Sequence, residues 1–347
     1  MKKHSAIFVG IGGVTLVIIL GVMLNSGETT HENKIRVAYF PNVNHAVPII
    51  GMEKGIFQNQ IGNNTVIEPK LFEAGPQVIE ALFAGLIDIA YVGPGPAING
   101  FLKSEDHNIK ILSGAASGGA SFIVHPNSKI NSYVDLAGKR IAAPQIGNTQ
   151  DISLRSYLSE NGLKPAEKGG SVIVLNLSSS DIYTLFAKGD IDAAWVPEPT
   201  ATILVQQLDG KRLFNEEELW PEHKFASVLL IAREDYVHQN PDLINNWVQA
   251  NKQTVNWINS NPEQTRKIFI DFMKKETGKS ISNDLVDEAL SNLEVTSDPN
   301  VSSIQTFAKR ADALGYLGRH GYSLDGIFFD INSNSQLEED LVNHDKT

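Results

Sequence analysis

One segment of this 347-residue chain is repeated, in altered form, further along the sequence. Leu82–Pro96 reads LFAGLIDIAYVGPGP, and Leu185–Pro199 reads LFAKGDIDAAWVPEP. The two segments align when one residue is skipped before Gly189. Each predicts a helix that ends at Gly and an Asp that leads into a buried strand. The strand is followed by an aromatic residue and a Pro-x-Pro corner. Two lobes built on one plan explain the repeat. Chance similarity is the alternative, because helix–Gly–strand units recur in α/β proteins.

Apolar runs that alternate with helical patterns extend this plan along the chain. The predicted strands are 35–40, 66–72, 87–92, 109–113, 121–125, 140–143, 172–177, 191–196 and 227–232. The predicted helices are 47–57, 76–84, 97–103, 149–161, 182–188, 241–260, 262–277, 283–293 and 301–314. This order predicts an α/β fold with mainly parallel sheets covered by helices.

Composition excludes several classes of function. The chain has no Cys, so disulfides, thiolate metal sites, cysteine nucleophiles and a lipidated N-terminal Cys are excluded. Its 29 Lys and Arg stand against 40 Asp and Glu, a net charge of −11 with no basic stripe, which argues against nucleic acid as a partner. No phosphate-binding loop, zinc-protease motif or nucleophile elbow is present, and we expect neither a cofactor nor enzymatic activity. The acidic run 216–218 is interpreted as a solvated surface.

The N-terminus predicts a membrane anchor. Lys2 and Lys3 precede an apolar run from residue 6 to residue 24, which spans about 28 Å as a helix, close to the apolar thickness of a bilayer. The positive end should stay inside, which places the rest of the chain outside the cytoplasm. Cleavage as a signal peptide is the alternative, but residues 25–27 make a poor cleavage site. Residues 27–33 are a polar tether.

Ligands of open α/β sheets bind beyond the carboxyl ends of strands, where helices begin. Four segments lie at such places: 40–46, 91–97, 114–121 and 143–151. The last segment suits an anion best, because Gly147 allows close approach and Asn148 or Thr149 begins a helix with unpaired N–H groups. An ordinary capped helix is the alternative. The Ser117-Gly118-Gly119 segment is either a donor nest or a flexible crossover loop.

Five side chains have both a functional and a structural interpretation. Tyr91 and Trp195 either wall a cleft or fill the core. Glu198, between two prolines, either faces a ligand amine or lies in solvent. Arg155 either pairs with a ligand anion or lies on a solvated face, and His45 is more typical of packing than of catalysis.

Five segments in this order resemble the substrate-binding proteins of ABC importers. The resemblance is to the aliphatic-sulfonate branch, which is related to taurine, nitrate, bicarbonate and thiamin-precursor binders, and it runs from about Lys34 to about Gly318. It implies a type II periplasmic-binding-protein fold, a ligand held between two lobes that close by hinge motion, and delivery by a monomer to a permease with a separate ATPase. The segments are AYFPNVNHA (38–46), DIAYVGPGP (88–96), GAASGG (114–119), PQIGNTQD (144–151) and WVPEP (195–199).

The resemblance also implies a division of the chain and a set of cleft residues. Residues 1–33 are an anchor or signal plus tether, residues 34–125 and 226–330 are lobe 1, residues 126–225 are lobe 2, and residues 331–347 are a polar tail. The two crossings between the lobes are expected near 122–125 and 225–229. The expected ligand-binding residues are Asn44, His45, Gly93, Pro94, Ser117, Gly118, Gly147, Asn148, Thr149, Trp195 and Glu198.

The sequence therefore predicts an extracytoplasmic solute-binding protein for a small organic anion, foremost an aliphatic sulfonate. One alternative is a thiamin-pyrimidine or other amine-bearing ligand held by Glu198. A ligand-sensing receptor domain is another, whereas the enzymes that resemble this fold depend on cysteines that the chain lacks. The acidic net charge opposes long-range capture of an anion, so attraction must come from local dipoles.

Overall fold

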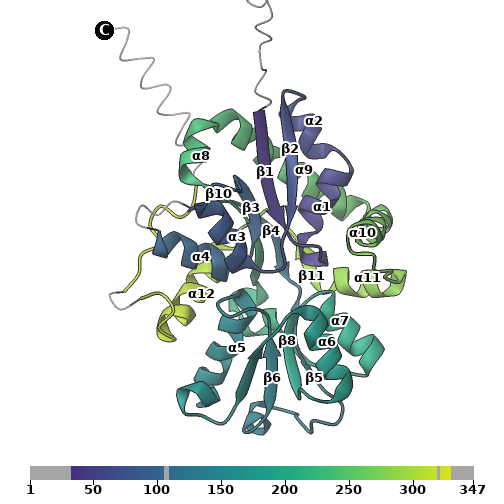
Figure 1. Ribbon diagram of the computed structural model, residues 1–347, viewed down its shortest axis with the longest axis vertical. Coiled ribbons are helices and arrows are strands. Elements are labelled where there is room, and N and C mark those ends of the chain that lie inside the picture. The colour runs from purple at the N-terminus through teal and green to yellow at the C-terminus, as the bar shows by residue number, and fades with distance from the viewer. Residues whose placement is uncertain (1–32, 105–108, 319–320, 330–347) are drawn as a thin grey trace, which may run out of the picture. The chain divides into compact units, whose positions relative to one another are not determined.

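The computed structural model describes residues 33–104, 109–318 and 321–329, which contain two β-sheets (Figure 1). The anchor predicted at 6–24, most of its tether and the predicted tail at 331–347 lie outside these residues. No helix within the described ranges is both long and apolar enough to cross a bilayer.

The first sheet has the strand order β11-β4-β10-β3-β1-β2. β1 runs parallel to β3, whereas β10 is antiparallel to both β3 and β4, and β11 is antiparallel to β4. Its strands are β1 (Asn33–Tyr39), β2 (Thr65–Leu71), β3 (Ile89–Val92), β4 (Ile109–Gly118), β10 (Ala226–Arg233) and β11 (Leu293–Val295).

The second sheet has the order β7-β6-β8-β5-β9. β6 is parallel to β7 and β8, and β5 is antiparallel to β8 and β9. Its strands are β5 (Ala120–Val124), β6 (Arg140–Ala143), β7 (Ile173–Asn176), β8 (Ala193–Pro197) and β9 (Lys211–Asn215). The α/β class is confirmed, but both sheets are mixed, because the strands next to the crossings run antiparallel to their neighbours.

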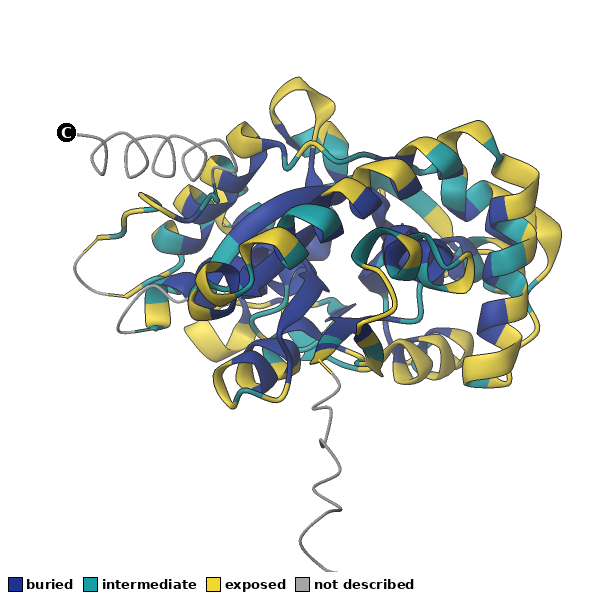
Figure 2. Ribbon diagram, turned by 90° about the horizontal axis from the view of Figure 1, so that it is seen from above, coloured by how far each residue is buried: buried dark blue, intermediate teal, exposed yellow. Residues whose placement is uncertain are grey.

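Helices cover both faces of each sheet, and the strands between them are the most buried part of the chain (Figure 2). The α-helices are α1 (Ala46–Glu53), α2 (Ile56–Ile61), α3 (Gly75–Phe83), α4 (Pro94–Lys103), α5 (Thr149–Glu160), α6 (Ser179–Lys188), α7 (Thr200–Leu208), α8 (Glu234–Gln239), α9 (Pro241–Ser260), α10 (Pro262–Thr277), α11 (Asn283–Ser291) and α12 (Val301–Ala313). Short 3-10 helices are η1 (Val43–His45), η2 (Tyr133–Leu136), η3 (Ala166–Lys168), η4 (Glu216–Leu219) and η5 (Pro221–His223). We call each sheet with its helices a lobe.

Several predicted elements differ from the observed ones. The helix predicted at 47–57 is two helices, because Gly55 adopts a left-handed conformation (φ 68°) between them. The predicted helix 283–293 ends at Ser291, and Leu293 begins β11. Strand β9 and helices α7 and α8 had no counterpart among the predicted elements, since their apolar patterns are short.

The chain passes from the first sheet to the second at Gly118–Gly119, earlier than the crossing predicted near 122–125. Both glycines have positive φ, 74° and 72°, which other residues adopt only with strain. β4 reaches Gly118 in the first sheet, and β5 starts at Ala120 in the second. The segment 114–118, predicted as a loop, is therefore strand. The return lies between β9 and β10, next to the predicted 225–229.

The internal repeat has the same hydrogen-bonded arrangement in each lobe. An Arg is bound by an Asp and by the carbonyl of a glycine, and we call this arrangement a clip. Asp88 accepts hydrogen bonds from the backbone N–H (2.8 Å) and Nε (2.9 Å) of Arg36, whose guanidinium also donates to the carbonyl of Gly85. In the second lobe, Asp192 accepts from the N–H (2.8 Å) and Nε (3.2 Å) of Arg140. The guanidinium of Arg140 again donates to a helix-ending glycine, Gly189. The shared geometry supports two lobes built on one plan.

Candidate functional site

The starts of two helices from different lobes meet at Thr149. The Oγ1 atom of Thr149, at the beginning of α5, accepts a hydrogen bond of 3.3 Å from the N–H of Gly95 in the first turn of α4. A Cβ atom on Gly93 would lie 2.2 Å from the same oxygen. The structure thus brings Gly93, with its neighbour Pro94, next to Thr149, and a side chain at position 93 would overlap the Thr149 hydroxyl.

The start of α5 is held rigidly from within its own lobe. Asn148 is the N-cap, and its Oδ1 accepts from the N–H of Thr149 at 2.9 Å. Asp151 Oδ2 accepts from the N–H of Gly147 at 2.9 Å, and Asp151 Oδ1 accepts from Arg155 Nε at 2.8 Å. Arg155 is thus a buried side chain that fixes Asp151 and the Gly147 turn. It does not lie on a solvated face, and it does not point at the meeting of the two helices.

Asn44 follows β1 in the first lobe as Asn148 follows β6 in the second. It is buried, and its Nδ2 donates to the carbonyls of Gly118 (3.4 Å) and Gly119 (3.1 Å). Because Nδ2 must donate to these two carbonyls, the free atom of the amide is Oδ1, which is buried without a partner. Ser117 is buried next to this link. Asn44, Ser117 and Gly118 therefore lie together at the crossing.

His45 belongs to the packing of the first lobe. Its ring lies 4.4 Å from the ring of Phe40, whose N–H is 3.4 Å from His45 Nδ1. Burial lowers the pKa of His45 to about 3, so the imidazole is neutral. The structural interpretation of His45 fits these contacts.

Glu198 is buried, and both of its oxygens already have donors. Oε1 accepts from Arg212 Nη2 at 3.0 Å and from Asn292 Nδ2 at 2.9 Å, and Oε2 accepts from the N–H of Thr202 at 2.9 Å. Burial raises the pKa of Glu198, and Arg212 and Thr202 oppose that rise. This carboxylate occupies the positive start of α7, the counterpart of α4 in the second lobe. It lies neither in solvent nor free for a ligand amine.

The two aromatic residues that end the repeated strands fill cores. Trp195 is 1 % exposed, and its ring packs at 5.3–5.6 Å from those of Phe122, Tyr157 and Phe214. The Tyr91 hydroxyl donates to Asn251 at 2.9 Å inside the first lobe. These contacts favour the core interpretation for both residues, in place of walls of a cleft.

The acidic run 216–218 is not simply a solvated surface. Glu216 is fully buried, and its Oε2 accepts from Trp195 Nε1 at 2.7 Å. Burial raises the pKa of Glu216 to about 7. Oε2 of Glu217 is buried without a partner, 3.5 Å from the position of a Cβ on Gly118. Ser227 likewise has a buried Oγ without a partner, and its carbonyl oxygen lies 3.4 Å from the position of a Cβ on Gly93.

Sequence reasoning missed Glu217 and Ser227 as residues of this region. Charge patterning interprets a run of three glutamates as surface, and no motif marks an isolated serine at the start of a strand. The resemblance to a family implied a second crossing near 225–229, which contains Ser227, but it assigned no role to Ser227 or to Glu217. Only the crossing of the chain brings them to the Gly93–Gly118 region.

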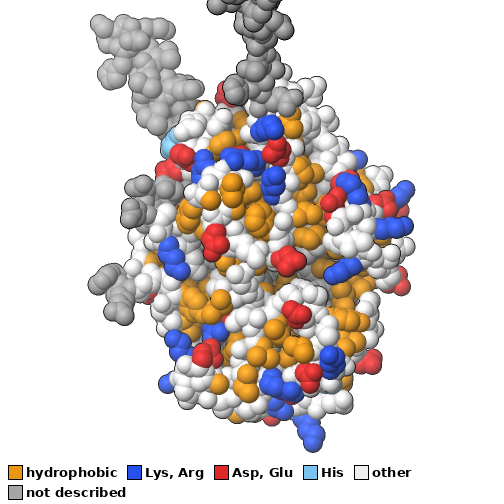
Figure 3. Space-filling model, viewed as in Figure 1, with side chains coloured by type: hydrophobic (Ala, Val, Ile, Leu, Met, Phe, Trp, Pro, Cys, Tyr) orange, Lys and Arg blue, Asp and Glu red, His pale blue; other side chains and the backbone are white. Residues whose placement is uncertain are grey.

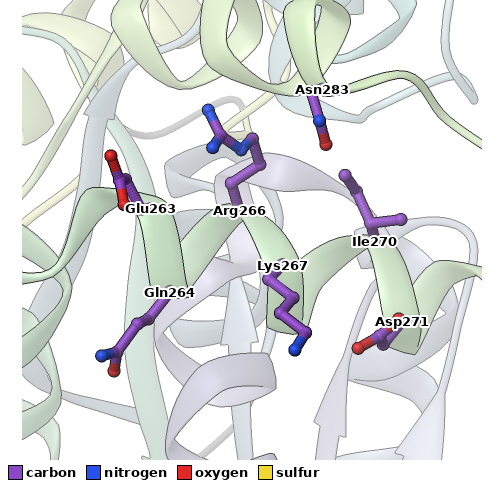
Figure 4. A pocket seen from close by; sticks show the side chains of 7 residues that line it. All are labelled: Glu263, Gln264, Arg266, Lys267, Ile270, Asp271 and Asn283. Atoms are coloured by element: carbon purple, nitrogen blue, oxygen red, sulfur yellow. The ribbon is translucent and has the colours of Figure 1, made fainter.

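Two surface grooves lie away from this region. One, of about 400 Å³, lies along α10 and reaches Asn283 at the start of α11; it is lined by Glu263, Arg266, Lys267 and their neighbours (Figure 4). The other, of about 270 Å³, lies between α5 and α12. Neither is lined by a predicted ligand-binding residue. On the face shown in Figure 3, acidic and basic side chains are interspersed.

Comparisons with known proteins find relatives that are named as binding proteins. A protein of Brucella abortus strain 2308, named as a binding protein, is 28% identical over 242 residues, which cover 69% of this chain and 72% of that protein. The taurine-binding periplasmic protein of Escherichia coli K12 is 28% identical over 182 residues, 52% of this chain and 54% of the relative.

Solved structures share the fold. The alkanesulfonate-binding protein of Xanthomonas axonopodis pv. citri, solved with MOPS bound, superposes with a TM-score of 0.69 at 20% identity, covering 82% of this chain and 94% of that one. The sequence model of the NMT1-like family matches residues 28–271. The match covers more than half of the chain, and the chain therefore belongs to the NMT1-like family.

Proposed function

We propose that this protein binds a small organic anion, foremost an aliphatic sulfonate, between its two lobes and delivers it to an ABC permease. The observation that carries the proposal is the meeting of the α4 and α5 starts at Thr149, where Gly93 leaves room for close approach. Backbone N–H groups at a helix start bind anions without a buried formal charge on the protein.

The start of α5 is the best of the neighbouring helix starts for the anion. α4 begins with Pro94 and Pro96, which have no N–H to donate. The start of α7 already holds the carboxylate of Glu198. In α5, the first-turn N–H groups of Gln150 and Asp151 have no carbonyl one turn earlier to bond, and the Thr149 hydroxyl stands beside them.

The relatives support the class of ligand. Two of the proteins described above are named for binding taurine and alkanesulfonates, and both ligands carry a sulfonate on a short carbon chain. A sulfonate needs several hydrogen-bond donors and no proton, which matches an array of backbone donors. We therefore propose binding without turnover. Conversion of a bound sulfonate, seen by mass spectrometry after incubation, would overturn this part of the proposal.

Replacing Asn148 by Ala should weaken sulfonate binding at least tenfold. The substitution removes the cap that orients the first turn of α5, at a cost of about 1 kcal/mol in helix stability, and loosens the donors around the anion. Calorimetric titration with taurine and ethanesulfonate measures the effect. The matched control is Ser178→Ala, which removes the N-cap of α6 in the same lobe. Equal effects of the two variants on affinity would contradict an anion site at α5.

We propose that lobe 1 comprises residues 34–119 with 226–330, and that lobe 2 comprises the residues between them. This moves the predicted boundary at 125/126 to the point where the chain changes sheet.

The relatives' periplasmic location supports a place outside the cytoplasm. We further propose that residues 6–24 anchor the chain in the membrane. The full chain should then stay in the membrane pellet after alkaline carbonate extraction, whereas a chain that starts at Lys34 should not. Release of the full chain into the supernatant would contradict the anchor.

A further inference from the structure

A helix of the first lobe holds the second-lobe helix that begins at the proposed anion site. α12 contacts both α4, in its own lobe, and α5, in the second lobe (Figure 1). Ile152, in the first turn of α5, is fully buried in the same apolar cluster as Phe307 of α12. Just beyond α12, the hydroxyl of Tyr316 donates at 3.4 Å to Asp151 Oδ2, the oxygen that also accepts from the N–H of Gly147. The start of α5 is therefore fixed from the first lobe as well as from its own.

The other end of α5 is tied to the first lobe by Arg310 of α12. Arg310 Nε forms an ion pair of 3.1 Å with Oε1 of Glu160, the last residue of α5. Arg310 Nη2 donates to the carbonyl of Leu219 at 2.9 Å, and the guanidinium lies 4.5 Å from the centre of the Trp220 ring. Leu219 and Trp220 belong to the segment between β9 and β10, where the chain returns to the first sheet. One side chain thus connects the two lobes and the second crossing.

The contact between α5 and α12 is polar and open to solvent at this end. The groove of about 270 Å³ described above is lined here by Ser156 and Glu160 of α5 and by Lys309 and Arg310 of α12. The side chains of Arg310 and Glu160 are 20% and 50% exposed, whereas Ile152 at the start of α5 is fully buried. An exposed ion pair breaks without uncovering apolar surface, so this end of α5 is the end that separates from α12 more readily.

Separation of the lobes affects the contacts of Arg310 unequally. A ligand enclosed between two lobes leaves when they rotate apart about their crossings. Leu219 and Trp220 lie in a crossing, so their distances to Arg310 change least in such a rotation. Glu160 lies in the body of the second lobe, so its distance to Arg310 increases. The ion pair is the contact of Arg310 that opening breaks.

We propose that Arg310 is a positioning residue for ligand retention: held at the second crossing, it pairs with Glu160, keeps the start of α5 against α4 and slows release of the ligand. This inference rests on the proposed function for the place of the ligand. Arg310 acts through α5 and contacts no ligand atom.

The test measures ligand release from the full chain after one charge is removed. Glu160→Gln keeps the length of the side chain and an oxygen that can accept from Ser156, but it removes the charge that pairs with Arg310. The pair is partly exposed and therefore weak, so we expect the dissociation rate to rise about threefold and the association rate to stay within about twofold. Stopped-flow tryptophan fluorescence measures both rates, with whichever of taurine and ethanesulfonate binds more tightly.

A double-mutant cycle separates retention from a purely structural role. Arg310→Gln should also raise the dissociation rate about threefold, and the double variant with Glu160→Gln should raise it no further, because all three lack the same pair. Independent effects would multiply to about ninefold. Loss of the contacts with Leu219 and Trp220 in Arg310→Gln should lower the melting temperature of the ligand-free protein without adding to the release rate.

Asp287→Asn is the matched control. Asp287 pairs with Arg266 between α10 and α11 of the first lobe, and its side chain is 47% exposed against 50% for Glu160. It should leave the dissociation rate unchanged. An unchanged rate in Glu160→Gln, an equal rise in Asp287→Asn, or a ninefold rise in the double variant overturns the inference and leaves the proposed function standing. If neither sulfonate binds the unaltered protein, the proposed function fails and this inference fails with it.

Discussion

Replacing Gly93 by Ala should lower ligand affinity about a hundredfold and leave the fold intact. The added methyl group would lie 2.2 Å from Thr149 Oγ1 and 3.4 Å from the carbonyl oxygen of Ser227, so the starts of α4 and α5 must separate. Overpacking of this kind costs about 1–3 kcal/mol, and every 1.4 kcal/mol is a tenfold change in affinity. The cost falls on the contact between these two helix starts. Titration with taurine measures it, and circular dichroism checks the fold.

Two further variants test whether the effect of Gly93→Ala comes from this contact. Adding Thr149→Ala removes the oxygen nearest to the new methyl group, so the double variant should reverse part of the separation that the single variant imposes, measured by small-angle X-ray scattering with ligand. Gly278→Ala, at the left-handed end of α10, should reduce stability by about 1 kcal/mol without changing affinity. A Gly93→Ala variant that binds within threefold of the unaltered protein would contradict the close approach of the two helix starts.

Replacing Asp88 by Ala should cost about 3 kcal/mol of unfolding free energy, whereas Asp192→Ala should cost about 1 kcal/mol. The two aspartates hold equivalent arginines, but their burial differs: the side chains of Asp88 and Arg36 are 3% and 32% exposed, and those of Asp192 and Arg140 are 20% and 38% exposed. Removing one partner of a buried pair costs about 3–5 kcal/mol, discounted here for the partly exposed Arg36, and exposed pairs contribute about 0–1 kcal/mol. Urea unfolding without ligand measures both.

The two clips serve as controls for each other, because the backbone N–H, the Nε and the glycine carbonyl are used in the same way in both. They differ in burial and in one further hydrogen bond, from Arg36 Nη2 to Asp88 Oδ1. Asp88→Asn keeps one acceptor for the backbone N–H of Arg36 and should lose less stability than Asp88→Ala. A loss for Asp192→Ala equal to or greater than that for Asp88→Ala would show that burial is not what sets the strength of these pairs.

The order of elements could be predicted from the sequence, because it follows from local patterns. The apolar run at 35–40, the Asn148–Thr149 helix start and the Gly189 helix end are each determined by a few neighbouring residues. The path of the chain between sheets could not be predicted in the same way. The residues 114–118 suit a loop as well as a strand, and pairing with β10 makes them strand.

The sequence by itself determined that the chain has two lobes on one plan, because the repeat fixes a helix, a turn and a strand by short-range chemistry in each half. The tertiary structure alone decided which polar side chains have partners. Glu198 lies in a predicted corner and Glu217 in a run interpreted as a solvated surface, yet Arg212, Asn292 and Thr202 saturate the first, and the second keeps a buried oxygen without a partner. The reason is physical: whether a buried polar group is satisfied depends on contacts between residues far apart in the chain, which no local pattern records.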